Sequence, residues 1–322
     1  MRIRKIIALL ICVSLMLLCV SGCGREMNSS GKKRIVATIF PEYDWVKQIT
    51  GENSSELDIT LLLSNGVDMH SFQPSVEDIM TISSCDMFIY VGGESDAWVN
   101  DALSQSSNKD MIVINLMDIL GDKAKEEEIV SGMQSDGDDD GGEEKEYDEH
   151  VWLSLRNTAL FCDKITEGLA KLDPKNADDY KRNCEEYKKK LNELDGEYKT
   201  AVEGSSLRTI IVGDRFPYRY LTDDYNIRYY AAFSGCSAET EASFETIIFL
   251  AGKADELNAK AVIKTEGSDG SVAETVRSNT KTGEQEILTL DSMQAAASAD
   301  IQGGMTYISV MKENLEVLKK AL

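Results

Sequence analysis

The sequence predicts an α/β protein of two lobes, each with a parallel sheet and surrounding helices, joined by one long spine helix. Three observations support this prediction. Short apolar, β-branched segments alternate with helical segments in the first half of the chain, and the same alternation returns in the second half. A long amphipathic stretch separates the halves. The length of 322 residues also favours more than one hydrophobic core.

Residues 1–22 are predicted to be an export signal. Arg2, Arg4 and Lys5 precede an apolar stretch, residues 6–20, that is too short for a comfortable membrane span. Small residues then stand directly before Cys23, which resembles a bacterial lipoprotein cleavage box. We therefore expect a protein anchored outside the cytoplasm by a lipid on Cys23. The alternative is an ordinary signal peptide that is cut near Gly24.

The polar segment 23–33 is predicted to be a lipidated tether, followed by a first lobe at 34–172. Helical segments at 43–50 and 76–83 lie between the apolar runs of this lobe. The predicted strands are 34–39, 57–63, 87–91 and 111–114.

The first lobe also contains an acidic loop at 122–149. Its core, residues 136–149, has nine acidic residues against one lysine and three glycines, so no regular element is expected there. This loop either collects cations before His150 or is a solvated surface insertion.

A linking helix is predicted at 173–203. Asp173-Pro174 is a helix-start signal, and apolar residues then recur at steps of three and four from Ala177 to Ala201. A helix over 176–202 would be about 40 Å long, enough to run beside both lobes. The second lobe is expected at 204–322, with strands at 209–212, 227–232, 261–264 and 286–290.

The formal net charge of −22 opposes binding to nucleic acid and attracts cations, although acidity also keeps an exported protein soluble. Four cysteines remain beyond Cys23, and none forms a C-x-x-C pair, so no thiolate metal knuckle is indicated. Cys162 and Cys184 are a candidate disulfide because both fall on predicted helices. Cys85 is expected to be part of the core.

Only two histidines occur, His70 and His150, and each stands in a short polar segment that presents it. Neutral imidazole is the commonest protein ligand for transition metals. In parallel sheets, ligands bind beyond the carboxyl ends of the strands, and Asp214, Glu266 and Asp291 each follow a predicted strand. Either aspartate could instead cap a helix.

The predicted metal ligands are His70, His150, Asp291 and Asp214, contributed by four separate segments. A cleft between the lobes could close these groups around one ion. Nitrogen and oxygen ligands favour zinc, with manganese as the alternative.

Over nearly the whole mature chain, the order of elements resembles the metal-binding (zinc- and manganese-type, cluster A-I) solute receptors of ABC transporters. The resemblance implies a spine helix between two α/β lobes, with the ion at their interface. It matches His70 and His150 to the first two ligands and Asp291 to the fourth, and it likens Glu266 to a glutamate near the ion. The matching segments are 39–41, 66–75, 149–153, 213–218, 235–241 and 290–292.

The chain departs from the family pattern at several positions. Alignment on Phe216 and Tyr218 places Gly213 at the third ligand position, so Asp214 is a possible substitute. Ala242 and Glu149 stand where the family usually has proline. The loop that is often rich in histidine in zinc receptors is acidic here.

We expect a monomeric, non-catalytic receptor that captures a divalent ion, with zinc favoured by the ligand chemistry, and passes it to an ABC permease. A metallohydrolase would need an open water position and a general base such as Glu149 or Glu239, and no H-E-x-x-H motif is present. A third class is an adhesin or scaffold with a structural metal.

Overall fold

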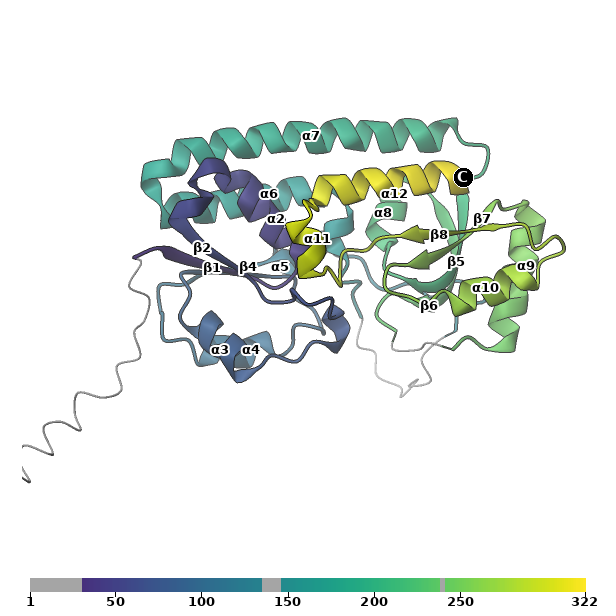
Figure 1. The fold of residues 1–322 in the computed structure, drawn as a ribbon, viewed down its shortest axis with the longest axis horizontal. Coiled ribbons are helices and arrows are strands. Elements are labelled where there is room, and N and C mark those ends of the chain that lie inside the picture. Colours follow the sequence, from purple (N-terminus) through teal and green to yellow (C-terminus); the bar gives the residue numbers. More distant parts are fainter. Residues whose placement is uncertain (1–30, 135–145, 238–240) are drawn as a thin grey trace, which may run out of the picture. The chain divides into compact units, whose positions relative to one another are not determined.

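Two four-stranded parallel sheets form the centre of the protein in a computed structural model, which describes residues 31–134, 146–237 and 241–322 (Figure 1). The strand order is β2-β1-β3-β4 in the first sheet and β6-β5-β7-β8 in the second. The strands are β1 Lys33–Ala37, β2 Leu57–Leu61, β3 Met87–Tyr90, β4 Ile112–Asn115, β5 Thr209–Phe216, β6 Arg228–Ser234, β7 Ala261–Thr265 and β8 Glu286–Leu290. This architecture confirms the predicted fold class. In each sheet the order reverses between two central strands, where parallel sheets place ligands.

Helices cover both sheets, and most of the predicted bounds lie within a few residues of those observed. The helices are α2 Phe40–Thr50, α3 Val76–Ser83, α4 Val99–Ser104, α5 Leu116–Leu120, α6 Leu155–Leu172, α7 Ala177–Gly204, α8 Arg219–Tyr225, α9 Phe244–Leu257, α10 Ser271–Ser278, α11 Ser298–Gln302 and α12 Tyr307–Ala321. Helix α2 begins three residues before its predicted start. Pro41 is tolerated in the first turn, and the Glu42 carboxylate accepts the backbone N–H groups of Thr38 and Ile39.

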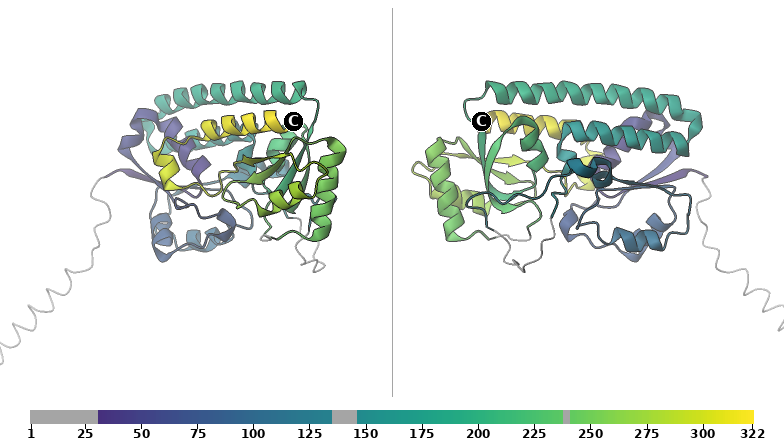
Figure 2. Two further views of the ribbon diagram at one scale, coloured as in Figure 1. Left: turned by 45° about the vertical axis from the view of Figure 1, so that its right-hand side comes forward. Right: turned by 180° about the vertical axis from the view of Figure 1, so that it is seen from behind.

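The predicted spine is helix α7, whose 28 residues span about 42 Å. Two views show it running beside both sheets (Figures 1 and 2). Its buried positions follow the predicted steps of three and four. They are Tyr180, Cys184, Tyr187, Leu191, Leu194, Tyr198 and Val202.

Helix α12, near the end of the chain, joins the second lobe to the first and was not predicted. The Tyr307 ring meets the Trp45 ring edge-on at 5.4 Å between centroids. The Tyr307 hydroxyl donates to the Trp152 carbonyl at 2.7 Å, and Asp44 accepts the Tyr307 backbone N–H at 2.9 Å. The two lobes therefore share one continuous buried core along α7 and α12.

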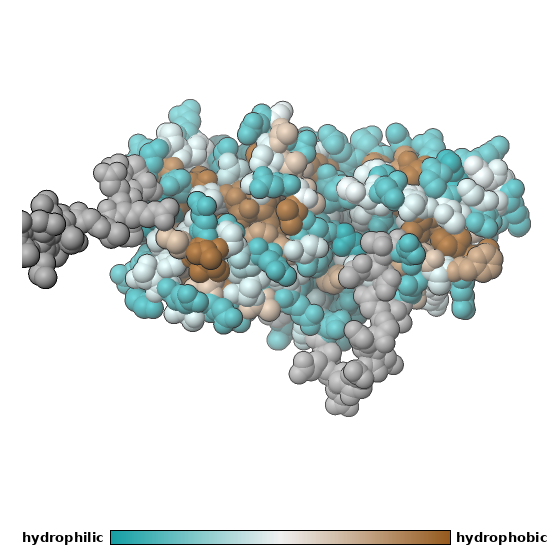
Figure 3. Space-filling view, turned by 60° about the horizontal axis from the view of Figure 1, so that its bottom comes forward, coloured by the Kyte–Doolittle hydropathy of each residue, from teal (hydrophilic) through white to brown (hydrophobic). Residues whose placement is uncertain are grey.

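Cys85, Cys162, Cys184 and Cys236 are free thiols in the structure, so the expected Cys162–Cys184 disulfide is not formed. The export signal, Cys23 and most of the acidic loop lie outside the described residues. None of the helices within residues 31–134, 146–237 and 241–322 combines the length and apolarity that a bilayer crossing requires. The face drawn in Figure 3 is largely hydrophilic, with separate apolar patches.

Candidate metal centre

His70 lies in a 3-10 turn, Met69–Ser71, that follows β2. Asp68 caps this turn by accepting the His70 backbone N–H at 3.0 Å through Oδ1. Its other oxygen, Oδ2, is 2.6 Å from the Arg215 guanidinium at the end of β5, so the turn is tied to the second lobe. The imidazole Nδ1 is 2.7 Å from the Ser95 hydroxyl. These contacts leave Nε2 as the nitrogen that faces the interior of the site.

His150 is fully buried at the start of a 3-10 turn, Val151–Leu153. Asp148 accepts both its backbone N–H, at 2.9 Å, and its Nδ1–H, at 3.1 Å. Because a carboxylate holds the proton on Nδ1, the Nε2 lone pair of the neutral ring is free to bind a metal. The Trp152 indole donates to the Ser292 carbonyl at 2.7 Å and so anchors this turn to the loop after β8.

The two imidazoles converge, as the sequence predicted. Their Nε2 atoms are 3.2 Å apart. Two nitrogen ligands of a tetrahedral zinc ion lie about 3.3 to 3.4 Å apart, given metal–nitrogen distances of about 2.0 to 2.1 Å. The separation in the protein is therefore close to that of two imidazoles sharing one ion.

The third group at this point is Gln294, which sequence reasoning missed. Its Oε1 is 3.0 Å from the His150 Nε2, and the residue is 3% exposed. The rule that selects the first polar residue after a strand chose Asp291 instead. No signal in the sequence marks Gln294, because a turn of the backbone decides which side chain of this loop points inward.

Asp291 has a different position from the one expected of a ligand. Its Oδ1 accepts the backbone N–H of Met293 at 2.7 Å, and its own N–H donates to Asn314. Met293 has a φ of 62°, which is unusual for a side chain of its size, so the loop turns sharply here. The Asp291 carboxylate thus shapes the turn that brings Gln294 to His150.

Glu266, which follows β7, holds the same loop from the other side. It accepts from the Ser292 N–H at 2.7 Å, the Ser292 hydroxyl at 2.5 Å and the Gln294 N–H at 3.3 Å. Burial and the charge of Asp291 raise the pKa of Glu266 to about 7. Glu266 therefore positions Gln294 through the backbone.

Asp214 lines a cavity of about 690 Å³ together with His70. Both of its carboxylate oxygens accept backbone N–H groups, from Arg215 at 2.8 Å and Thr265 at 3.2 Å. Gly213, at the third ligand position of the family pattern, touches α10 closely. A Cβ there would be 2.5 Å from the Cα of Ala273, so a side chain has no room at this position.

His70 also belongs to a second cluster of side chains that could bind a metal ion. Within residues 31–134, 146–237 and 241–322, one set of histidine, cysteine, aspartate or glutamate side chains brings three ligand atoms within 4.8 Å of one another, and it consists of His70, Glu149 and Cys236. Neither Asp214 nor Asp291 belongs to it. The predicted ligand set is therefore divided in this structure: the imidazoles meet, and the two aspartates bind backbone groups elsewhere.

The electrostatics of the two imidazoles differ. Burial, and then the neighbouring His150, lower the pKa of His70 to about 4. Burial also favours neutral His150, but the carboxylates of Asp148 and Glu149 outweigh it and raise the pKa of His150. The two shifts have opposite causes, because burial and a second imidazole dominate at His70 whereas carboxylates dominate at His150.

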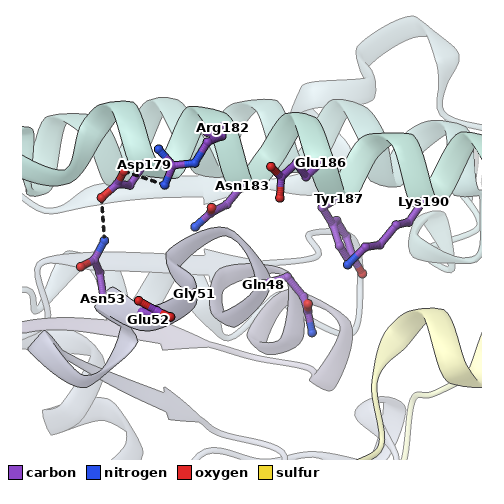
Figure 4. A pocket seen from close by; sticks show the side chains of 10 residues that line it. All are labelled: Gln48, Gly51, Glu52, Asn53, Asp179, Arg182, Asn183, Glu186, Tyr187 and Lys190. Atoms are coloured by element: carbon purple, nitrogen blue, oxygen red, sulfur yellow. Dashed lines mark hydrogen bonds and ion pairs between the residues drawn. The ribbon is translucent and has the colours of Figure 1, made fainter.

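A separate cavity of about 410 Å³ lies between α2 and α7 (Figure 4). Asp179 in its lining binds Arg182 at 2.7 Å and accepts from Asn53 at 3.4 Å. Asn183 donates to the Ile49 carbonyl. This cavity is a polar gap between packed helices, and neither histidine lines it.

The fold, with two parallel sheets joined along a long helix, is that of a two-lobed solute-binding protein. Residues 35–321 match the family model of zinc-uptake complex component A, periplasmic, also called ZnuA. The chain belongs to this family, which confirms the resemblance seen in the sequence.

Individual relatives agree with the family match. The chain is 25% identical over 301 residues to the zinc-binding protein AdcA of Streptococcus pyogenes, covering 92% of this chain and 57% of that protein. It therefore spans little more than half the length of this relative. The high-affinity zinc uptake system protein ZnuA of Bacillus subtilis is 27% identical over 314 residues, with 95% and 94% coverage. The crystal structure of the metal-dependent lipoprotein YcdH of Bacillus subtilis matches with a TM-score of 0.73 at 26% identity, covering 90% of this chain and 99% of that one.

Proposed function

We propose that this protein captures a zinc ion outside the cytoplasm and delivers it to the membrane permease of an ABC importer. The observation that carries the proposal is the 3.2 Å approach of the His70 and His150 Nε2 atoms. The zinc-binding and zinc-uptake names of the relatives support zinc as the cargo. Manganese is the alternative cargo, because nitrogen and oxygen ligands also suit that ion.

We propose His70 and His150 as the two imidazole ligands, with the amide oxygen of Gln294 beside them. Asp214 and Asp291 stay predicted ligands of the zinc-bound protein. In this structure both aspartates accept backbone N–H groups. Replacing each with asparagine and with alanine separates ligation from turn formation, since asparagine retains an oxygen that accepts the backbone bond.

The two histidines allow a direct test, because tag-free protein contains only these two imidazole rings. Nitrogen NMR of the imidazoles should show both Nε2 resonances shifting together as one equivalent of zinc is added to metal-stripped protein. His70→Ala and His150→Ala should each weaken zinc binding severely in calorimetric titrations. Unchanged Nε2 resonances at saturating zinc would refute the site.

We also propose that the mature protein is a monomeric, lipid-anchored receptor without enzymatic turnover. The anchor would be an acyl group on Cys23, with residues 1–22 removed and 23–33 serving as the tether. The lobes would correspond to residues 34–172 and 204–322, with 173–203 as the linking helix. Mass spectrometry of the protein from its native membrane tests the anchor, since an acylated chain that begins at Cys23 is expected.

A further inference from the structure

Beside the imidazole pair lies the thiol of Cys236, which follows β6 and is partly buried. A ligand atom of His70, a carboxylate oxygen of Glu149 and the Cys236 sulfur all lie within 4.8 Å of one another. A thiol near an imidazole is not by itself a metal site. The second observation is a buried carboxylate oxygen of Glu149 that lacks a hydrogen-bond partner among the described residues.

Glu149 is only 1% exposed, and its two oxygens have different environments. Oε1 accepts the Ser95 backbone N–H at 2.9 Å, whereas Oε2 is buried without a hydrogen-bond partner among the described residues. A buried carboxylate oxygen without a partner is costly unless a proton or a cation is bound there. The unpaired oxygen therefore marks a position where positive charge is needed.

The surrounding backbone is built to hold this carboxylate. Gly93 has a φ of +89°, and a Cβ at that position would be 2.5 Å from the Glu149 Oε1. On the opposite side, Glu127 accepts the Cys236 backbone N–H at 3.2 Å and fixes the start of its segment. Glu127, Glu149 and Cys236 line a cavity of about 230 Å³ together with His70 and Ser95.

We propose that His70, Glu149 and Cys236 form a second position for the zinc ion, with one imidazole, one carboxylate and one thiolate as ligands. The proposal rests on the proposed function in taking zinc as the cargo. Binding breaks the Cys236 S–H bond, forms a sulfur–zinc bond and releases one proton to water. A tetrahedral ion at this position would take its fourth ligand from water in the cavity.

The two positions share His70, so one ion occupies them in turn. His150 and Gln294 belong to the deeper position, and Cys236 belongs to the one that opens on the acidic 230 Å³ cavity. The Cys236 position is thus an intermediate binding site through which the ion reaches the imidazole pair. Removing His150 should leave the ion there.

The test uses cobalt(II) and zinc(II) as probes on the whole metal-stripped protein. Thiolate bound to cobalt gives a charge-transfer absorption in the near ultraviolet, which imidazole and carboxylate do not give. We expect this absorption in His150→Ala, its loss in the double variant His150→Ala/Cys236→Ser, and its retention in His150→Ala/Cys184→Ser. The last is the matched control, because Cys184 is a buried thiol outside the site. X-ray absorption of zinc-loaded His150→Ala should show a sulfur at about 2.3 Å.

Zinc affinity of His150→Ala should fall by roughly tenfold or more when Cys236 is also replaced by serine. Circular dichroism checks that each variant is folded, and Cys236→Ala is a second replacement if the serine variant is not. If the metal bound to His150→Ala has no sulfur ligand, the second position is refuted. The proposed site at the two imidazoles is unaffected by that result. Failure of the unmodified protein to bind zinc or cobalt would overturn the proposed function as well.

Discussion

Asp291 and Gln294 have different roles in the loop after β8, although the sequence had pointed to Asp291 alone. The Asp291 carboxylate closes a turn on Met293, and the amide of Gln294, three residues later, reaches the His150 imidazole. An acidic residue directly after a strand is therefore a good indicator of a functional loop. It does not identify the side chain in that loop that lies nearest to His150.

The first prediction concerns Gln294. Gln294→Ala should weaken zinc binding, because it removes the oxygen nearest the His150 Nε2. Gln294→Glu should strengthen it, since charged oxygen binds a dication better than a neutral amide does. Isothermal titration with zinc measures both. Equal affinity in all three proteins would show that Gln294 lies outside the ion's coordination sphere.

The second prediction concerns Glu42, which is fully buried. Burial and the charge of Asp96 raise the pKa of Glu42 to about 8, far above its value in an unfolded chain. Between about pH 4.5 and pH 8 the folded protein holds a proton that the unfolded chain releases, so stability falls as the pH rises through this window. The slope from this one group is at most about 1.4 kcal/mol per pH unit.

Glu42→Gln removes the titrating proton and should flatten that slope. Urea unfolding of metal-free protein at pH 5 and pH 8 measures it for both proteins. The informative quantity is the difference between the two pH values, because the amide also adds a buried N–H that shifts stability equally at both. Parallel slopes in the two proteins would contradict the assignment.

Regular elements followed closely from local sequence pattern. Helix α3 and strand β8 have the predicted bounds, and α7 begins four residues after and ends one residue after the predicted linking helix at 173–203. Periodicity is a property of consecutive residues, so it can be recognised without knowledge of the fold. Helix α12 was not predicted although its apolar period is regular. Its partners Trp45 and Tyr198 lie far away in the sequence, so only the structure shows how it joins the lobes.

The third prediction concerns the contact between β5 and α10. Gly213→Ala should destabilise the protein by roughly 1 to 3 kcal/mol, because the new methyl group would collide with the backbone of Ala273. Gly196→Ala is the matched control. It lies on α7 with open space around it and should stabilise the protein by about 0.5 to 1 kcal/mol. Chemical unfolding of both variants measures the difference, and a neutral Gly213→Ala would refute the close contact.

The molecule as a whole combines a shared core with a site drawn from several segments. Helix α7 runs beside both sheets, whereas α12 lies along the second sheet and contacts α2 of the first lobe (Figure 1). His70, His150 and Gln294 come from separate loops and approach one another at the His150 Nε2 atom. Arg215 bound to Asp68, and Trp152 bound to Ser292, each join segments from different lobes beside the site. Zinc would therefore hold together segments that are far apart in the chain.

The fourth prediction follows from this arrangement. Zinc should raise the thermal unfolding temperature, since an ion that binds only the folded protein stabilises it by about 2.7 kcal/mol at a free concentration of 100 times Kd. The double variant His70→Ala/His150→Ala should melt at the same temperature with and without zinc. Differential scanning calorimetry makes the comparison. A zinc-induced rise of equal size in the double variant would show that the stabilising ion binds elsewhere.

The sequence by itself determined the α/β class, the two lobes, the spine helix and the pairing of His70 with His150. These features depend on local periodicity and on the scarcity of histidine, both of which are visible along the chain. Only the tertiary structure decided that Asp291 shapes a turn, that Gln294 reaches His150, and that Cys236 and Glu149 lie beside His70. Those contacts depend on backbone turns and on packing between segments that are far apart in the chain, which no local pattern encodes.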